Sequence, residues 1–135
     1  MLSKKCKYAL KALRRMAMNE GTILKTQEIA SLENIPKKFL EHILNDLRAH
    51  AFIGSKKGAE GGYYLIKPAK SILISDVYRL FDGAIALLPC ASDKYYEPCD
   101  DCPDPETCKM KSVFIEVRNK TYKLLSKKTI LSMVE

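Results

Sequence analysis

The chain has 135 residues, of which 47% are hydrophobic and 29% charged, a composition typical of a folded domain rather than a disordered segment. This length suits one small domain with an appended arm and excludes a large catalytic barrel. No apolar run approaches the roughly 18 residues of a membrane span, and the basic N-terminus lacks the apolar block of a secretion signal. We therefore expect a cytoplasmic protein with no membrane partner.

The net charge of +7 is unevenly distributed along the chain. Residues 1–70 carry 14 Lys/Arg and 6 Asp/Glu, whereas residues 71–110 carry 3 and 8. A basic region attracts nucleic acid, because contacts to phosphates release condensed counterions. A lysine-rich solvated surface has the same composition, so charge alone leaves both interpretations open.

The first 50 residues predict three helices in quick succession. Ser3 is expected to cap the first, which Gly21 ends. Thr26 is expected to cap a second at residues 27–32, and Pro36 to occupy the first position of a third. The third has an apolar stripe formed by Phe39, Leu40, Ile43, Leu44 and Leu47. Its other faces are free to contact a partner and include Lys37, Lys38, Glu41, His42 and Asn45.

A β-hairpin is predicted directly after these helices. Residues 52–55 and 63–66 are short β-prone runs on either side of a glycine-rich segment that also contains Lys56 and Lys57. Helices joined by a tight turn and followed by a basic hairpin predict a winged helix-turn-helix. Its third helix would read the major groove of double-stranded DNA, and its wing would contact the backbone or the minor groove.

The rest of the chain predicts three more helices, the first two of which lie on either side of a loop. Ser75 is expected to begin a short helix that ends at Gly83, and the proline-rich residues 89–105 are expected to form a loop. A long helix from about 106 to 126 carries apolar residues that are too exposed for one small chain, which predicts a homodimer. Residues 129–134 are expected to form a short helix that packs at the same dimer contact as the long helix.

Four of the five cysteines cluster late in the chain. In a reducing cytoplasm such a group favours a metal or iron-sulfur site over disulfides. Thiolates bind both zinc and iron-sulfur clusters, and the spacing does not decide between them, although a single CxxC pair is unlike a zinc ribbon. The alternative interpretation is that these cysteines bind no metal and are free thiols in a loop. The candidate ligands are Cys90, Cys99, Cys102 and Cys108, whereas Cys6 is interpreted as a packing residue.

No pattern for catalysis is present. His42 and His50 are the only histidines, and neither belongs to a recognisable nucleophile-histidine arrangement. The glycines of residues 58–62 do not match the phosphate-binding Walker pattern. We expect a protein that is not an enzyme.

The sequence resembles the winged-helix bacterial repressors that include the iron-sulfur cluster regulator IscR, the nitric-oxide sensor NsrR and the cysteine-metabolism repressor CymR. The resemblance runs end to end and is carried by Lys7–Leu10, Phe39–Leu44, Lys57–Tyr63, Asp76-Val77, Cys102-x5-Cys108 and Thr129–Leu131. It implies a homodimeric transcription regulator whose long helix forms the dimer seam. It also implies an iron-sulfur cluster, either [2Fe-2S] or [4Fe-4S], in the cysteine loop.

The resemblance further implies roles for individual residues. Lys38, Glu41 and His42 align with base-reading positions, and Lys57 aligns with a wing residue that enters the minor groove and is usually arginine. The family's cysteine triad is C-x5-C-x5-C, but Tyr96 stands at its first position, so Cys99 or Cys90 would replace that ligand.

The predicted fold is mainly α with a small β-hairpin wing. We expect a winged helix-turn-helix in residues 1–82, a cysteine-rich cluster loop in 83–108, and a dimerisation helix with a C-terminal tail in 109–135. Two alternatives stay open. One is a cluster-free regulator of cysteine or sulfur metabolism controlled by an enzyme partner. The other is a small redox or electron-carrier protein, which would leave the basic winged region without a role.

Overall fold

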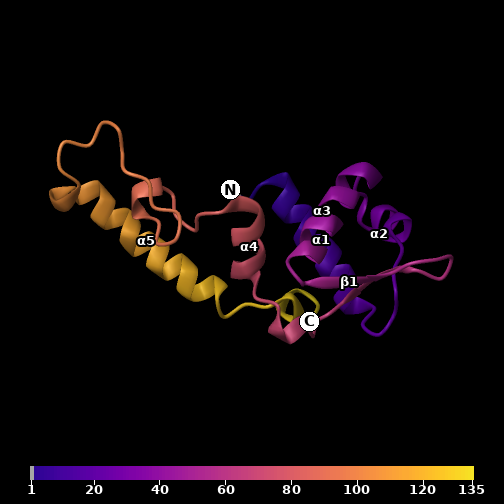
Figure 1. Cartoon of the computed structure of the whole chain (residues 1–135). Helices are drawn as coiled ribbons and strands as arrows, with labels where there is room; N and C mark the ends of the chain where they lie inside the picture. Colours follow the sequence, from indigo (N-terminus) through magenta and orange to yellow (C-terminus); the bar gives the residue numbers. More distant parts are fainter. Residues whose placement is uncertain (1) are drawn as a thin grey trace.

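The computed structural model describes residues 2–135 and has the predicted fold class, with five α-helices and a two-stranded hairpin in that range. The elements are α1 (Lys4–Met18), α2 (Thr26–Glu33), α3 (Lys37–Ala49), β1 (Ile53–Lys56), β2 (Gly62–Leu65), α4 (Ile74–Asp82) and α5 (Lys109–Leu125). Short 3-10 turns lie between and after them: η1 (Ala69–Ser71), η2 (Pro89–Ala91), η3 (Pro105–Thr107) and η4 (Ile130–Met133). Figure 1 shows α1–α3 and the hairpin as one head, from which α5 extends to the side as an arm.

The head has an apolar core between α1, α2, α3 and β1. Leu13, Ile29, Leu40 and Ile53 are fully buried there, and burial of each such side chain stabilises the fold by about 1.5–3 kcal/mol. The predicted cap is confirmed, because the Ser3 hydroxyl accepts a hydrogen bond from the Cys6 N–H at 3.0 Å. This core fixes the orientation of α3.

The apolar stripe predicted for α3 is confirmed. Leu40, Ile43, Leu44 and Leu47 are fully buried, and Phe39 is half-buried with its ring edge against Tyr8 at a centroid distance of 5.5 Å. One side of α3 is therefore committed to the core.

The hairpin forms the wing and is attached to the head. Its register pairs Ile53 with Leu65 and Lys56 with Gly62. Leu24, just before α2, exchanges two backbone hydrogen bonds with Tyr63, at 3.0 and 2.7 Å. These bonds join the base of the wing to the segment between α1 and α2.

Helix boundaries differ from the predictions at several points. Thr26 is the first residue of α2 rather than its cap, and Pro36 precedes α3. Helix α4 begins at Ile74, not at Ser75, and the Ser75 side chain is buried instead of capping the helix. The reason lies in a distant segment, because the Ile74 N–H donates to the Lys128 carbonyl at 2.9 Å.

The end of the chain packs in the head, which corrects the expectation that it lies along the long helix. Ile130 of η4 is fully buried in the head core. Its N–H donates to the Ile72 carbonyl at 2.9 Å, and Arg14 Nε of α1 donates to the Met133 carbonyl at 2.8 Å. The chain therefore leaves the head after α4 and returns to it after α5, as Figure 1 shows.

Helix α5 is the long helix that the sequence predicts, although it starts at Lys109 because Pro105–Thr107 forms a separate turn. None of its residues is buried. Its contacts to α4 include the Arg79 guanidinium, which lies 4.6 Å from the centre of the Tyr122 ring. Across residues 2–135, we find no helix with the length and hydropathy needed to cross a bilayer.

Candidate DNA interface and cysteine site

The residues predicted to read DNA share the solvent-facing side of α3. Their spacing along one helix places them on one face, opposite the buried stripe. All are exposed, namely Lys37, Lys38, Glu41, His42 and Asn45. The turn that presents this face is tight: Asn34 adopts a left-handed conformation, and the Ile35 N–H donates to the Ala30 carbonyl at 3.0 Å.

Two ion pairs link the helices of the head. Arg15 Nε lies 3.2 Å from Glu33, whose side chain is only 9% exposed, and Lys5 Nζ lies 3.0 Å from Asp46 on α3. Within residues 2–135, by contrast, neither Lys37 nor Lys38 belongs to an ion pair. The outer face of α3 thus presents cations without internal carboxylate partners.

The wing adds two more exposed cations. Lys56 ends β1 and Lys57 follows it at the hairpin tip. The turn depends on Gly61, because a Cβ there would collide with the Lys56 carbonyl oxygen. Arg48 Nη1 of α3 lies 3.4 Å from the Ser55 hydroxyl of β1, so α3 and the wing also contact each other directly.

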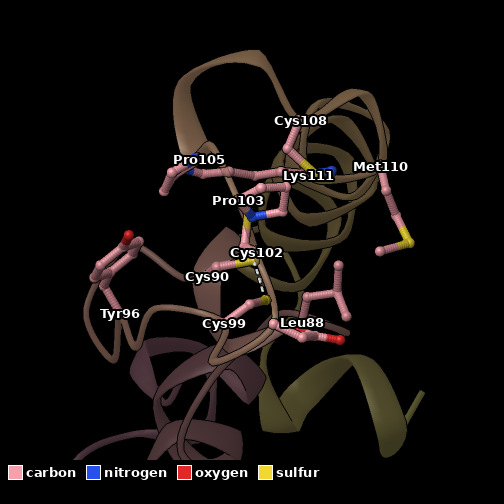
Figure 2. Close-up of a pocket in the computed structure, with 11 residues that line it drawn as sticks. Leu88, Cys90, Tyr96, Cys99, Cys102, Pro103, Pro105, Cys108, Met110 and Lys111 are labelled. Carbon is pink, nitrogen blue, oxygen red and sulfur yellow. Dashed lines mark hydrogen bonds between the residues drawn. The ribbon is translucent and has the colours of Figure 1, made fainter.

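The structure brings the four late cysteines to one cavity of about 160 Å³ (Figure 2). They come from different segments: Cys90 lies in η2, Cys99 and Cys102 lie in the following loop, and Cys108 is the residue that caps α5. The wall also includes the apolar and aromatic side chains of Leu88, Tyr96 and Met110. Figure 2 shows the cavity between the loop and the start of α5.

Two of the thiols are in direct contact. The Cys99 thiol donates a hydrogen bond to Cys90 Sγ with a sulfur-sulfur distance of 3.4 Å. This hydrogen bond, together with burial, raises the pKa of Cys99 to about 11. At neutral pH the free Cys99 side chain is therefore a neutral thiol.

Cys108 has a different environment, at the N-terminus of α5. Its sulfur accepts a hydrogen bond from the Lys111 N–H at 3.4 Å. Backbone N–H groups at a helix N-terminus stabilise anions, and a metal-bound thiolate is one of these. A metal ion or cluster bound to the Cys108 sulfur would therefore be attached directly to the N-terminus of α5.

The donor set suits an iron-sulfur cluster, since four soft sulfur ligands surround a single cavity. The geometry is not preformed: within the described part of the chain, no three His, Cys, Asp or Glu side chains converge as a metal site. Cluster binding would require the loop to draw its sulfurs together. Cys6 is remote from this cavity and fully buried in α1, where burial raises its pKa to about 12, in agreement with a packing role.

Sequence reasoning missed Arg118, which joins the arm to the cysteine turn. Its Nη1 donates to the Ala91 carbonyl at 2.7 Å, directly after Cys90, and lies 3.6 Å from Asp93. The available signal was its position four residues after Phe114, a spacing that places both residues on one face of a helix.

The chain matches the profile of the Rrf2 family, described as an iron-dependent transcriptional regulator, over residues 2–135. The protein belongs to the Rrf2 family. An rrf2-like HTH-type transcriptional regulator of Rhodobacter capsulatus is 46% identical to this Rrf2 protein over 121 residues, covering 87% of this chain and 81% of the relative. These homologues are transcriptional regulators, which are not enzymes. A DNA-binding regulator implies DNA as the partner of this Rrf2 protein.

Solved structures of other regulators share the fold of this Rrf2 protein. The global cysteine regulator CymR of B. subtilis superposes with a TM-score of 0.80 at 24% identity, covering 99% of this chain and 95% of that one. IscR of T. potens superposes with a TM-score of 0.77 at 21% identity, covering 99% and 85%. These likenesses confirm the winged-helix fold predicted from the sequence.

Proposed function

We propose that this Rrf2 protein is a cytoplasmic homodimeric repressor that senses iron-sulfur status, redox state or nitric oxide through a [2Fe-2S] or [4Fe-4S] cluster. One observation carries the proposal: four thiols surround a single cavity at the outer end of an arm whose other end is built into the DNA-binding head. In this proposal residues 1–82 bind DNA, residues 83–108 hold the cluster and residues 109–135 form the dimerisation arm, with η4 returning to the head.

The proposed DNA contacts follow from exposure and charge. The exposed face of α3 fits the major groove, which admits one helix, and supplies both cations and hydrogen-bonding groups for base edges. On the wing, Lys56 and Lys57 would contact phosphates or enter the minor groove. The residues assigned to DNA are Lys37, Lys38, Glu41, His42, Asn45, Lys56 and Lys57.

Dimerisation is proposed through α5. This helix of 17 residues has no buried residue in the single chain, and Met110, Val113 and Leu124 are each more than half exposed. Most of the stability of a helix in a protein comes from tertiary packing of its apolar face rather than from helix propensity. A second copy of α5 would cover its apolar side chains and place two reading heads in one molecule.

The proposed cluster ligands are Cys102 and Cys108 with Cys90, Cys99 or both. When bound, the cluster supplies a centre that oxidants and nitric oxide can alter. The chain itself links this centre to the head, because Cys108 caps α5 and Arg118 ties α5 to the turn that carries Cys90. A coupling of about 1–3 kcal/mol between cluster occupancy and head spacing would change DNA affinity roughly 5- to 150-fold.

Anaerobic purification tests the cluster. We expect a coloured protein that contains iron and sulfide and that loses its visible absorption in air. Cys102→Ala and Cys108→Ala should abolish the chromophore, whereas Cys6→Ala is the matched control and should retain it. A colourless, iron-free protein prepared without oxygen would contradict the proposal.

A second candidate is a cluster-free regulator of cysteine or sulfur metabolism that is controlled by an enzyme partner. It is favoured by the separation of the thiols, since no three potential ligands converge within residues 2–135, and by the fold shared with CymR. Its signature would be iron-free protein after anaerobic purification, with a DNA affinity that changes only when a cysteine-synthesising enzyme is added.

A further inference from the structure

The contact between Cys90 and Cys99 is the starting point. Their sulfurs are 3.4 Å apart, and no other pair among the described cysteines is joined by a hydrogen bond. A disulfide bond is about 2.05 Å long, so the two sulfurs would need to approach by only roughly 1.4 Å. Neither residue belongs to the Cys102-x5-Cys108 pair that carries the family resemblance.

Hydrogen bonds within the connecting segment hold this pair together without a metal. The Glu97 N–H, two residues before Cys99, donates to the carbonyl of Pro89, the residue before Cys90, at 3.3 Å. The Ser92 hydroxyl accepts a hydrogen bond from the Tyr95 N–H at 3.0 Å and closes the turn between the two cysteines. Cys99 itself lies in irregular loop, where a small movement breaks no helix or strand.

We propose that Cys90 and Cys99 of the cluster-free protein form an intramolecular disulfide when they meet a hydroperoxide. This inference deepens the proposed function, because it gives the same cavity a second response to oxidants. It does not require that a cluster ever binds, since the two sulfurs are already adjacent in the metal-free chain.

The reaction balances in two steps. One cysteine thiol attacks the hydroperoxide: the O–O bond breaks, an S–O bond forms to give a sulfenic acid, and the thiol proton leaves with the other oxygen as an alcohol or water. The second thiol then attacks the sulfenic sulfur: the S–S bond forms, the S–O bond breaks, and the hydroxyl leaves with the second thiol proton as water. The two sulfurs supply two electrons, both of which reduce the peroxide, and the product is the same whichever sulfur reacts first.

Access and position favour this pair over the other thiols. Cys90 is 6% exposed but lines the cavity, which a small hydroperoxide can enter. Cys6 is fully buried in the head and is out of reach. Cys102 and Cys108 line the same cavity, but neither forms a hydrogen bond to another cysteine sulfur.

The disulfide would affect both halves of the site. It would remove two of the four candidate cluster ligands until it was reduced. It would also constrain the turn η2, in which Ala91, the residue after Cys90, accepts the hydrogen bond from Arg118. Oxidation at the cavity would therefore act on the attachment of α5.

The sequence allows a direct test by peptide mapping. Cleavage before aspartates places each late cysteine on its own peptide: Cys90 in residues 82–92, Cys99 in 93–99, Cys102 in 101–103 and Cys108 in 104–135. Full-length protein is freed of metal with a chelator, reduced, treated with hydrogen peroxide and alkylated before digestion. We expect residues 82–92 linked to 93–99, with free thiols falling from five to three per chain.

Variants make the test specific. Cys99→Ser should lose the link, whereas Cys102→Ser is the matched control from the same cavity and should retain it. A dominant link to peptide 101–103 or 104–135, or thiol oxidation without any link, overturns the inference. Binding of an iron-sulfur cluster is measured in a separate reconstitution experiment. A Cys90–Cys99 disulfide in a protein that binds no cluster would refute only the proposed cluster, and a bound cluster without the disulfide would refute only the disulfide.

Discussion

The attachment of the arm at Arg118 can be tested by replacing the guanidinium while keeping the length of the side chain. In Arg118→Met the charged donor to the Ala91 carbonyl is lost, and a flexible apolar side chain remains to fill the space. The Arg118 side chain is 17% exposed, so water can replace only part of this hydrogen bond.

The structure also indicates the size of the effect. Hydrogen bonds to charged groups contribute about 1.5–3 kcal/mol, and partial exposure places this one near 1.5 kcal/mol. The ion pair to Asp93 adds little, because that carboxylate is 80% exposed at 3.6 Å and pairs of this kind contribute about 0–1 kcal/mol. Asp93→Asn is therefore the matched control and should change the free energy of unfolding by less than about 0.5 kcal/mol.

Urea unfolding followed by circular dichroism, at one fixed protein concentration, measures both variants. Hydrogen exchange should localise the loss in Arg118→Met to residues 89–92 and α5, leaving α1–α3 protected. If Asp93→Asn costs as much as Arg118→Met, or if Arg118→Met is indistinguishable from the wild type, the guanidinium does not hold the arm as described.

Three further changes test the wing and the core. Lys57→Ala should lower the slope of log affinity against log salt by about 0.9 if Lys57 meets a phosphate; Lys120→Ala on α5 should leave it unchanged, and equal slopes in all proteins would remove Lys57 from the interface. Ile130→Ala should cost about 2–5 kcal/mol in urea unfolding because the side chain is fully buried, whereas Ile66→Ala, at a position 53% exposed, should cost far less; similar losses would place η4 outside the core. The pKa of Cys6 rises from 9.0 to about 12 in the fold, so the folded state retains a proton that the unfolded chain loses. The free energy of unfolding should therefore fall as pH rises from about 9 towards 12, and Cys6→Ala should flatten this pH dependence; an unchanged profile would assign it to other groups.

The head was predictable because its signals are local. The stripe of α3 needs only the helical period, and the wing needs only two β-prone runs around glycines. The exposed position of Lys37, Lys38 and Glu41 follows directly from the stripe that buries Leu40. Residue types and spacing were sufficient to predict an element wherever its own sequence determines which of its faces is buried.

The misplaced features depend on contacts between distant segments. Ile74 joins α4 because the Lys128 carbonyl accepts its N–H, a partner more than fifty residues away. The burial of Ile130 depends in the same way on α1 and η1. The Cys90–Cys99 contact arises from the fold of an irregular loop, which spacing alone does not define.

The return of the chain to the head fixes the C-terminal end of α5. Only Ser126, Lys127 and Lys128 separate its last turn from Thr129, and backbone hydrogen bonds to Leu124 and Leu125 tighten two of these three residues. Because this connection is short and hydrogen-bonded, it cannot act as a flexible linker that absorbs a tilt of α5 at its cysteine end. A displacement of α5 would instead be transmitted to Ile130, which packs among the side chains that support α1, and from there to the helices proposed to face DNA.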